Sequence, residues 1–181
     1  MTHCLDDIIA LFDGLFHDRY RTRLVRGGDE PLYRPADAGH PYHRVIFARG
    51  FFASALHEIS HWCIAGARRR EWEDYGYWYH PDGRDAEQQR RFEAAEVAPQ
   101  ALELLFSRAC GLTFNVSVDN LGEVEVDRDG FRARVEARAA RYESEGLPLR
   151  AAAFRMALKA FYQSDSSLPG ALAKGRRQLE E

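Results

Sequence analysis

Cysteine is scarce in this 181-residue sequence, and the three that occur, Cys4, Cys63 and Cys110, are far apart. Such a distribution excludes a disulfide framework and is typical of a reducing compartment, so we expect a cytoplasmic protein. The first residues also lack the basic stretch and apolar run of a signal peptide. The most apolar window, residues 45–65, is interrupted by histidine and charged side chains, so we expect no membrane span.

An excess of charge of one sign is also missing, because 25 Lys and Arg stand against 28 Asp and Glu, a formal net charge of −3. A general nucleic-acid binder needs a clustered basic surface, so we expect no direct contact with nucleic acid. The sequence contains no G-x-S-x-G, Walker or dinucleotide-binding motif, which argues against the enzyme classes defined by them. No repeat or linker divides the chain, and we expect a single domain spanning residues 1–181.

What the sequence does contain is alternating helical and extended apolar patterns. Helical spacing predicts helices over residues 4–17, 51–67, 85–98, 128–144 and 149–162, with Pro99 either kinking the third or opening a new helix to Arg108. Extended patterns predict strands at 22–25, 45–48, 75–79 and 113–118. Asp85 and Gln88 have the spacing of a capping box, and the polar last dozen residues should be loosely held. This mixture predicts an α+β fold.

The central chemical motif is the H-E-x-x-H sequence formed by His57, Glu58 and His61. Residues four apart share one face of a helix, which places both imidazoles within reach of one metal ion. Glu58 lies roughly 100° further round the helix than His57, close enough to reach a metal-bound water without binding the metal. Two such histidines could instead lie on a solvated face, but this helix is rich in apolar residues, and a buried pair without a common partner would be costly. We therefore predict metal ligation.

Two histidines on one helix need a third ligand from elsewhere in the chain. Glu93 and Glu96 lie three residues apart on a predicted helix, and both are candidates. Glu96 precedes the apolar residues 97–102, where the helix should turn inward, whereas Glu93 could ligate instead or orient a histidine. The spacing alone leaves this choice open.

The ligand set does not identify the metal, because two histidines and a carboxylate bind zinc in peptidases and iron(II) in oxygenases. Zinc would indicate hydrolysis, with Glu58 as the general base, whereas iron would indicate reduction of dioxygen. From the residues alone, a zinc metallopeptidase is the first interpretation. A non-catalytic, metal-stabilised binding module is the alternative outside the enzymes.

Several sequence blocks together make a more specific pattern than H-E-x-x-H: residues 49–51, 53–55, 57–66, 76–79, 81–86, 92–93, 96–97 and 99–102, with further matches near 29–38 and 114–121. In these blocks, which extend over most of residues 20–122, the chain resembles the elongation factor P hydroxylase family. The resemblance implies a zinc-peptidase-like fold and a metal site of His57, His61 and Glu96. It also implies iron(II) as cofactor, with dioxygen as co-substrate, although the spacing alone does not exclude zinc.

The resemblance further implies that the substrate is a lysine at a loop tip of elongation factor P that already bears a β-lysyl group. Glu58 would then handle protons or orient a bound water. A long cationic substrate side chain calls for a narrow, acidic and partly aromatic channel. The candidates to line this channel are Tyr77, Tyr79, Asp82 and Asp85.

Overall fold

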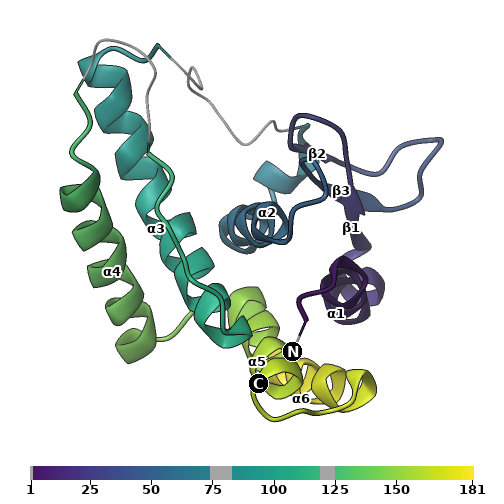
Figure 1. Ribbon diagram of the computed structural model, residues 1–181. Helices are drawn as coiled ribbons and strands as arrows, with labels where there is room; N and C mark the ends of the chain where they lie inside the picture. The colour runs from purple at the N-terminus through teal and green to yellow at the C-terminus, as the bar shows by residue number, and fades with distance from the viewer. Residues whose placement is uncertain (1, 74–82, 119–124) are drawn as a thin grey trace.

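The computed structural model describes residues 2–73, 83–118 and 125–181, and within them it has an α+β architecture, as predicted (Figure 1). The α-helices are α1 (Leu5–Tyr20), α2 (Phe52–Ile64), α3 (Ala86–Cys110), α4 (Arg128–Glu145), α5 (Leu149–Tyr162) and α6 (Leu168–Glu180). The strands are β1 (Thr22–Arg26), β2 (Leu32–Arg34) and β3 (His43–Phe47), and a short 3-10 helix spans Arg69–Glu71. The predicted strand at 75–79 lies outside the described residues.

The three strands form a small sheet in the order β1-β3-β2, with β1 parallel and β2 antiparallel to the central β3. Leu24 of β1 pairs with Val45 of β3, and both side chains are buried. Helix α1 packs on β1 and α2 packs on β3, so the sheet supports the helix that contains the H-E-x-x-H motif. The sequence did not predict β2, because it is only three residues long and lies between two prolines.

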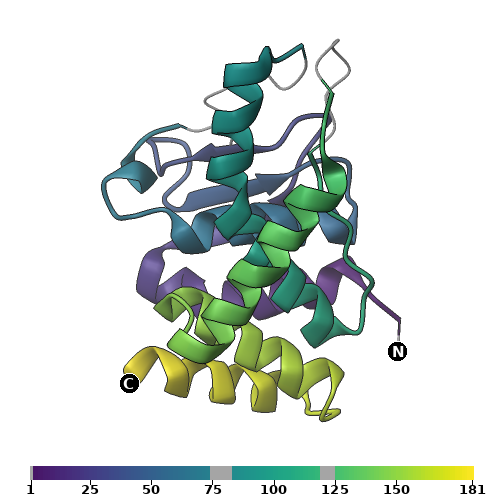
Figure 2. The ribbon, with the colours of Figure 1, turned by 90° about the vertical axis from the view of Figure 1, so that its left-hand side faces the viewer.

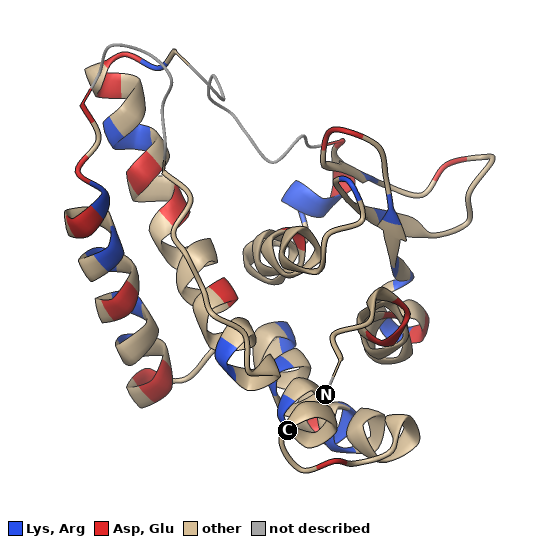
Figure 3. Cartoon of the chain, viewed as in Figure 1, with Lys and Arg blue, Asp and Glu red and all other residues tan. Residues whose placement is uncertain are grey.

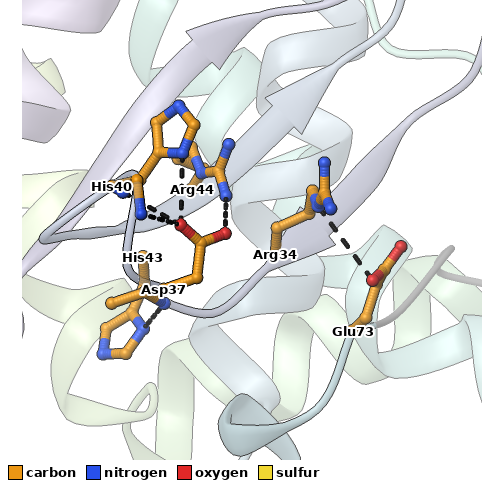
Figure 4. A network of polar contacts seen from close by, with 8 residues as sticks. Arg34, Asp37, His40, His43, Arg44 and Glu73 are labelled. Atoms are coloured by element: carbon orange, nitrogen blue, oxygen red, sulfur yellow. Dashed lines mark hydrogen bonds and ion pairs between the residues drawn. The ribbon is translucent and has the colours of Figure 1, made fainter.

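The connection between β2 and β3 is held by a polar network centred on Asp37 (Figure 4). The Asp37 carboxylate accepts hydrogen bonds from the backbone N–H of His40 and from the guanidinium of Arg44, at 2.9 and 3.1 Å. His43 Nδ1 accepts the backbone N–H of Ala36 at 2.8 Å. These two histidines therefore have structural partners in this loop.

Helix α3 lies at the centre of the helical part and contacts α2, α4 and α5. It begins with the predicted capping box, in which Asp85 accepts the backbone N–H of Gln88 and the Gln88 side chain accepts that of Asp85. The idea that a second helix opens at Pro99 is wrong, because α3 continues through it to Cys110. Proline removes the hydrogen bond to the carbonyl four residues back, and that residue, Ala95, is exposed, so water can replace the bond.

The strand predicted at 113–118 does not form. This segment runs along α3, where the Gln100 side chain donates to the carbonyl of Ser117 at 2.8 Å and accepts its N–H at 2.9 Å. Gln89 donates in the same way to the carbonyl of Val118, at 3.1 Å. The apolar pattern of Val116 and Val118 predicts a strand, whose backbone groups would pair with another strand. In the structure, glutamine side chains satisfy these backbone groups instead.

The prediction that the C-terminal residues are loosely held is also wrong, because α6 packs along α5 and against α1 (Figures 1 and 2). Ala171, Leu172 and Leu179 are buried in this contact. The approach is close at Gly175, where a Cβ atom would lie 2.7 Å from Leu15 Cδ2 and 3.0 Å from the carbonyl oxygen of Ala153. The tail is polar on average, but its apolar residues share one helix face.

Acidic and basic residues are interspersed along α4 (Figure 3). Helix α4 contacts α3 through a narrow apolar face formed by Phe131, Val135, Ala139 and Tyr142. The rest of its surface is charged, as in a solvated helix that covers one side of a neighbour. Helix α4 therefore supports α3 from the side opposite to α2.

Two arginines hold the C-terminal end of α2. Arg150 of α5 donates hydrogen bonds to the carbonyls of Trp62 and Ala65, at 2.7 and 2.6 Å, and Arg70 donates to Ala65 at 2.7 Å. The Arg150 guanidinium also lies 4.6 Å from the Trp62 ring centroid. The last carbonyls of a helix lack intrahelical partners and carry partial negative charge, so these cations both satisfy and stabilise them.

We expect Arg150→Met to lower the free energy of unfolding by about 2–3 kcal/mol, because it removes charged donors from two carbonyls. For a chain of this length the melting temperature should fall by roughly 5–10 °C, measurable by calorimetry. Arg141→Met is the matched control, since the Arg141 side chain is 62% exposed and pairs with Glu145 on the surface of α4. That change should cost less than about 1 kcal/mol. Equal losses in the two variants would contradict the role assigned to Arg150.

Candidate metal centre

Helices α2 and α3 pack together and bring His57, His61 and Glu96 into one cluster. Each contributes one potential ligand atom, and these atoms all lie within 4.8 Å of one another. His61 Nε2 is 3.0 Å from Glu96 Oε2, and His57 Nε2 is 3.8 Å from Glu96 Oε1. The structure thus joins the three side chains that sequence analysis singled out, from two helices about 40 residues apart in the chain.

The other candidate, Glu93, faces a different neighbour. Its carboxylate lies 3.8 Å from Arg134 of α4, whereas Glu96, one turn later, is 3% exposed and turned toward α2. Because residues three apart differ by about 60° around a helix, one face of α3 can meet α2 while the other meets α4. Of the two glutamates, Glu96 alone belongs to the cluster.

Two buried polar atoms in the cluster lack hydrogen-bond partners within the described part of the chain: His61 Nε2 and Glu96 Oε2. They lie only 3.0 Å apart, but their orientation does not make a hydrogen bond. Buried polar atoms left unpaired are costly, and two ligand atoms that each lie about 2.1 Å from one ion are typically about 3 Å apart. These residues therefore fit a divalent metal ion.

Sequence analysis missed Glu103, which is buried on α3 and accepts a hydrogen bond from His57 Nδ1 at 2.5 Å. Glu103 follows Glu96 by seven residues, or two helical turns, and so shares its face. A signal was present, since Glu103 is a charged residue inside the apolar run 101–106. That position by itself does not identify the partner, because His57 is 46 residues away.

The cluster strongly favours positive charge. Burial opposes protonation of His57, but the hydrogen bond and charge of Glu103, with the charges of Glu58 and Glu96, outweigh it and raise its pKa to about 10. Burial likewise opposes ionisation of Glu96, but His61 and His57 outweigh it and hold the pKa of Glu96 below its usual value. Burial raises the pKa of Glu58. Three carboxylates around two imidazoles therefore suit a bound cation.

A buried arginine, Arg84, is a second feature that sequence analysis missed. It is 2% exposed, its guanidinium lies 3.8 Å from the Phe92 ring centroid, and its Nε donates to Gln89 at 2.7 Å. Its charge contributes to the lowered pKa of Glu96. Arg84 thus contributes positive charge to the surroundings of the Glu96 carboxylate.

Cys63 lies two residues after His61 of the H-E-x-x-H motif. It is buried, and burial raises the pKa of its thiol to about 12. A thiol with this pKa stays protonated at neutral pH and is a poor nucleophile. Cys63 therefore serves as a small apolar core residue of α2.

Most of the predicted channel lies outside the described residues, namely Tyr77, Tyr79 and Asp82. Asp85 is described, and it is exposed at the N-terminus of α3, where one of its carboxylate oxygens caps the helix. A role for these four residues in substrate binding stays a prediction.

Comparison with known proteins decides the family. The sequence profile of the elongation factor P hydroxylases matches residues 11–171. This chain belongs to the elongation factor P hydroxylase family. It is 50% identical, over 168 residues, to the elongation factor P lysine hydroxylase of Haemophilus influenzae, and the match covers 93% of this chain and 94% of that protein.

Membership confirms the resemblance found in the sequence blocks, and it identifies the chain as an enzyme of the oxidoreductase class. The match also includes α4 and α5, which the distinctive blocks did not reach. No helix in the described ranges is long and apolar enough to cross a membrane.

Proposed function

We propose that this protein hydroxylates a modified lysine of elongation factor P with iron(II) and dioxygen, and that residues 1–181 act as one hydroxylase domain. The main support is the cluster of His57, His61 and Glu96, found in a chain that belongs to a hydroxylase family. The relative in Haemophilus influenzae is named for action on a lysine of elongation factor P. Because that factor serves translation, we place the reaction in the cytoplasm.

In this proposal the ion is held by Nε2 of His57, Nε2 of His61 and the Glu96 carboxylate. Iron(II), when bound, supplies the redox chemistry for dioxygen reduction, which zinc lacks. A set of three protein ligands leaves coordination positions open for co-substrate. Helix α3 covers the two imidazoles and keeps them largely away from solvent. The side chains of His57 and His61 are 15% and 23% exposed.

Glu58 is the residue to which we assign proton transfer. It follows His57 directly on α2, and the charges of His57, His61 and Glu96 all act on it. It lies outside the three-ligand cluster, so its carboxylate stays available to hold or deliver a proton beside the reacting lysine carbon.

The substrate side chain is long and cationic, and we propose that it approaches along Tyr77, Tyr79, Asp82 and Asp85. Aromatic faces and carboxylates attract an ammonium group and can orient it. The β-lysyl group would extend the reach of the target lysine into such a channel.

Intact-mass measurement of β-lysylated elongation factor P tests this function directly. We expect a gain of one oxygen atom after incubation with the protein, iron(II), air and a chemical reductant. The gain should disappear without oxygen and should be absent from the factor that lacks the β-lysyl group. Peptide cleavage without oxygen would contradict the proposal and favour a zinc peptidase, and an unchanged mass with the iron-loaded protein would contradict any hydroxylase activity on this substrate.

A further inference from the structure

Glu103 occupies an unusual place for a carboxylate. It lies between Leu102 and Leu104 on α3 and is 9% exposed. A buried charge is expensive unless it is paired, so its presence needs a partner or a function. Its partner among the described residues is His57, whose Nδ1 is 2.5 Å from Glu103 Oε1.

This contact fixes the state of the His57 ring. An ionised carboxylate can only accept hydrogen bonds, so Nδ1 of His57 must carry the proton that it donates. A metal-binding imidazole is neutral, and with Nδ1 protonated its free lone pair is then on the other nitrogen. That nitrogen, Nε2, points to the cluster, 3.8 Å from Glu96 Oε1. Glu103 therefore selects the tautomer and the ring orientation that a metal ion needs.

One helix supplies both carboxylates. Glu96 and Glu103 are two turns apart on the same face of α3, with Gln100 between them clamped to Ser117. Contacts of α3 with α2, α4 and α5 hold this face in place. The two histidines differ in this respect. Nδ1 of His57 has Glu103 as its partner, whereas no described residue hydrogen-bonds to Nδ1 of His61.

We propose that Glu103 is a positioning residue, which orients His57 through Nδ1 and so determines how tightly the centre binds a divalent metal. The inference rests on the metal-dependent function proposed above. Glu103 touches neither the metal nor the substrate in this scheme. Its effect passes through the His57 ring, as with the outer partners of other metal-binding histidines.

Cobalt(II) alone, titrated against a competing chelator and followed by its visible spectrum, provides the test. We expect Glu103→Ala to weaken cobalt binding by about 10–100-fold. Glu103→Gln keeps the shape and an accepting oxygen but loses the charge, and we expect a loss of about tenfold. Glu93→Gln is the matched control, because its side chain is similarly buried, at 14% against 11% exposed, on the same helix and is also ion-paired. It should bind cobalt as the unchanged protein does.

A second readout separates positioning from a purely structural role. In the zinc-loaded protein, 15N NMR of the His57 ring should show Nδ1 protonated, and Glu103→Ala should shift that signal. If Glu103→Ala fails to fold, Glu103→Gln decides alone. Unchanged cobalt affinity in the glutamine variant, or an unchanged His57 signal in a folded alanine variant, would overturn the proposal.

These measurements use no elongation factor P, so they fail separately from the proposed function. The Glu103 variants could bind cobalt more weakly while the protein without substitutions fails to hydroxylate elongation factor P. That result would remove the hydroxylase proposal and leave the positioning role. If the protein without substitutions is active but the Glu103 variants bind cobalt as tightly as it does, the positioning role is removed and the hydroxylase proposal is left.

Discussion

Glu96→Gln should lose metal binding and, with it, hydroxylation of elongation factor P. The amide keeps the size of the side chain but removes the charge from the only carboxylate in the three-residue cluster. Losing an outer partner of a metal ligand typically costs 10–100-fold in affinity, so loss of a direct ligand should cost more than about 100-fold. Metal content after dialysis and the intact mass of the substrate measure the two losses.

Glu93→Gln controls for this experiment, because Glu93 lies one turn earlier on the same helix and contacts Arg134 instead. We expect it to keep both metal and activity. The opposite result, with Glu93→Gln inactive and Glu96→Gln loaded and active, would reverse the choice between the two glutamates.

Glu58→Gln should separate metal binding from catalysis. Since Glu58 is outside the ligand cluster, the variant should keep its iron, whereas the turnover number should fall by about 100–10,000-fold if proton transfer is lost. The non-catalytic binding module predicts no loss of function in the same variant. Turnover under saturating iron, with metal content measured on the same sample, distinguishes these outcomes.

A surface glutamate provides the comparison for Glu58. Glu87 lies in the first turn of α3, where its exposed side chain pairs with Arg91. Glu87→Gln should leave turnover unchanged. If Glu58→Gln loses iron as completely as Glu96→Gln, Glu58 is a ligand and the assignment of proton transfer to it fails.

The features that the sequence predicted well depend on short spacings. His57 and His61 are one helical turn apart, so their shared face follows from the helix alone. The same is true of the capping box of Asp85 and Gln88. The choice of Glu96 over Glu93 came from the family resemblance, and the packing of α3 between α2 and α4 now gives it a physical reason.

The features that it missed depend on contacts between distant segments. Glu103 meets His57 only because α3 packs on α2, and no local pattern contains that information. Residues 113–118 looked like a strand, yet the side chains of Gln89 and Gln100 satisfy their backbone groups. The tail looked loose because its average polarity hid one apolar face on α6.

One divalent ion should bind between α2 and α3, and anomalous diffraction at the iron edge tests this most directly. Crystals grown with iron(II) under anaerobic conditions should show one strong peak in contact with His57 Nε2, His61 Nε2 and the Glu96 carboxylate. A peak elsewhere on the chain, away from these three side chains, would contradict a metal site between the two helices.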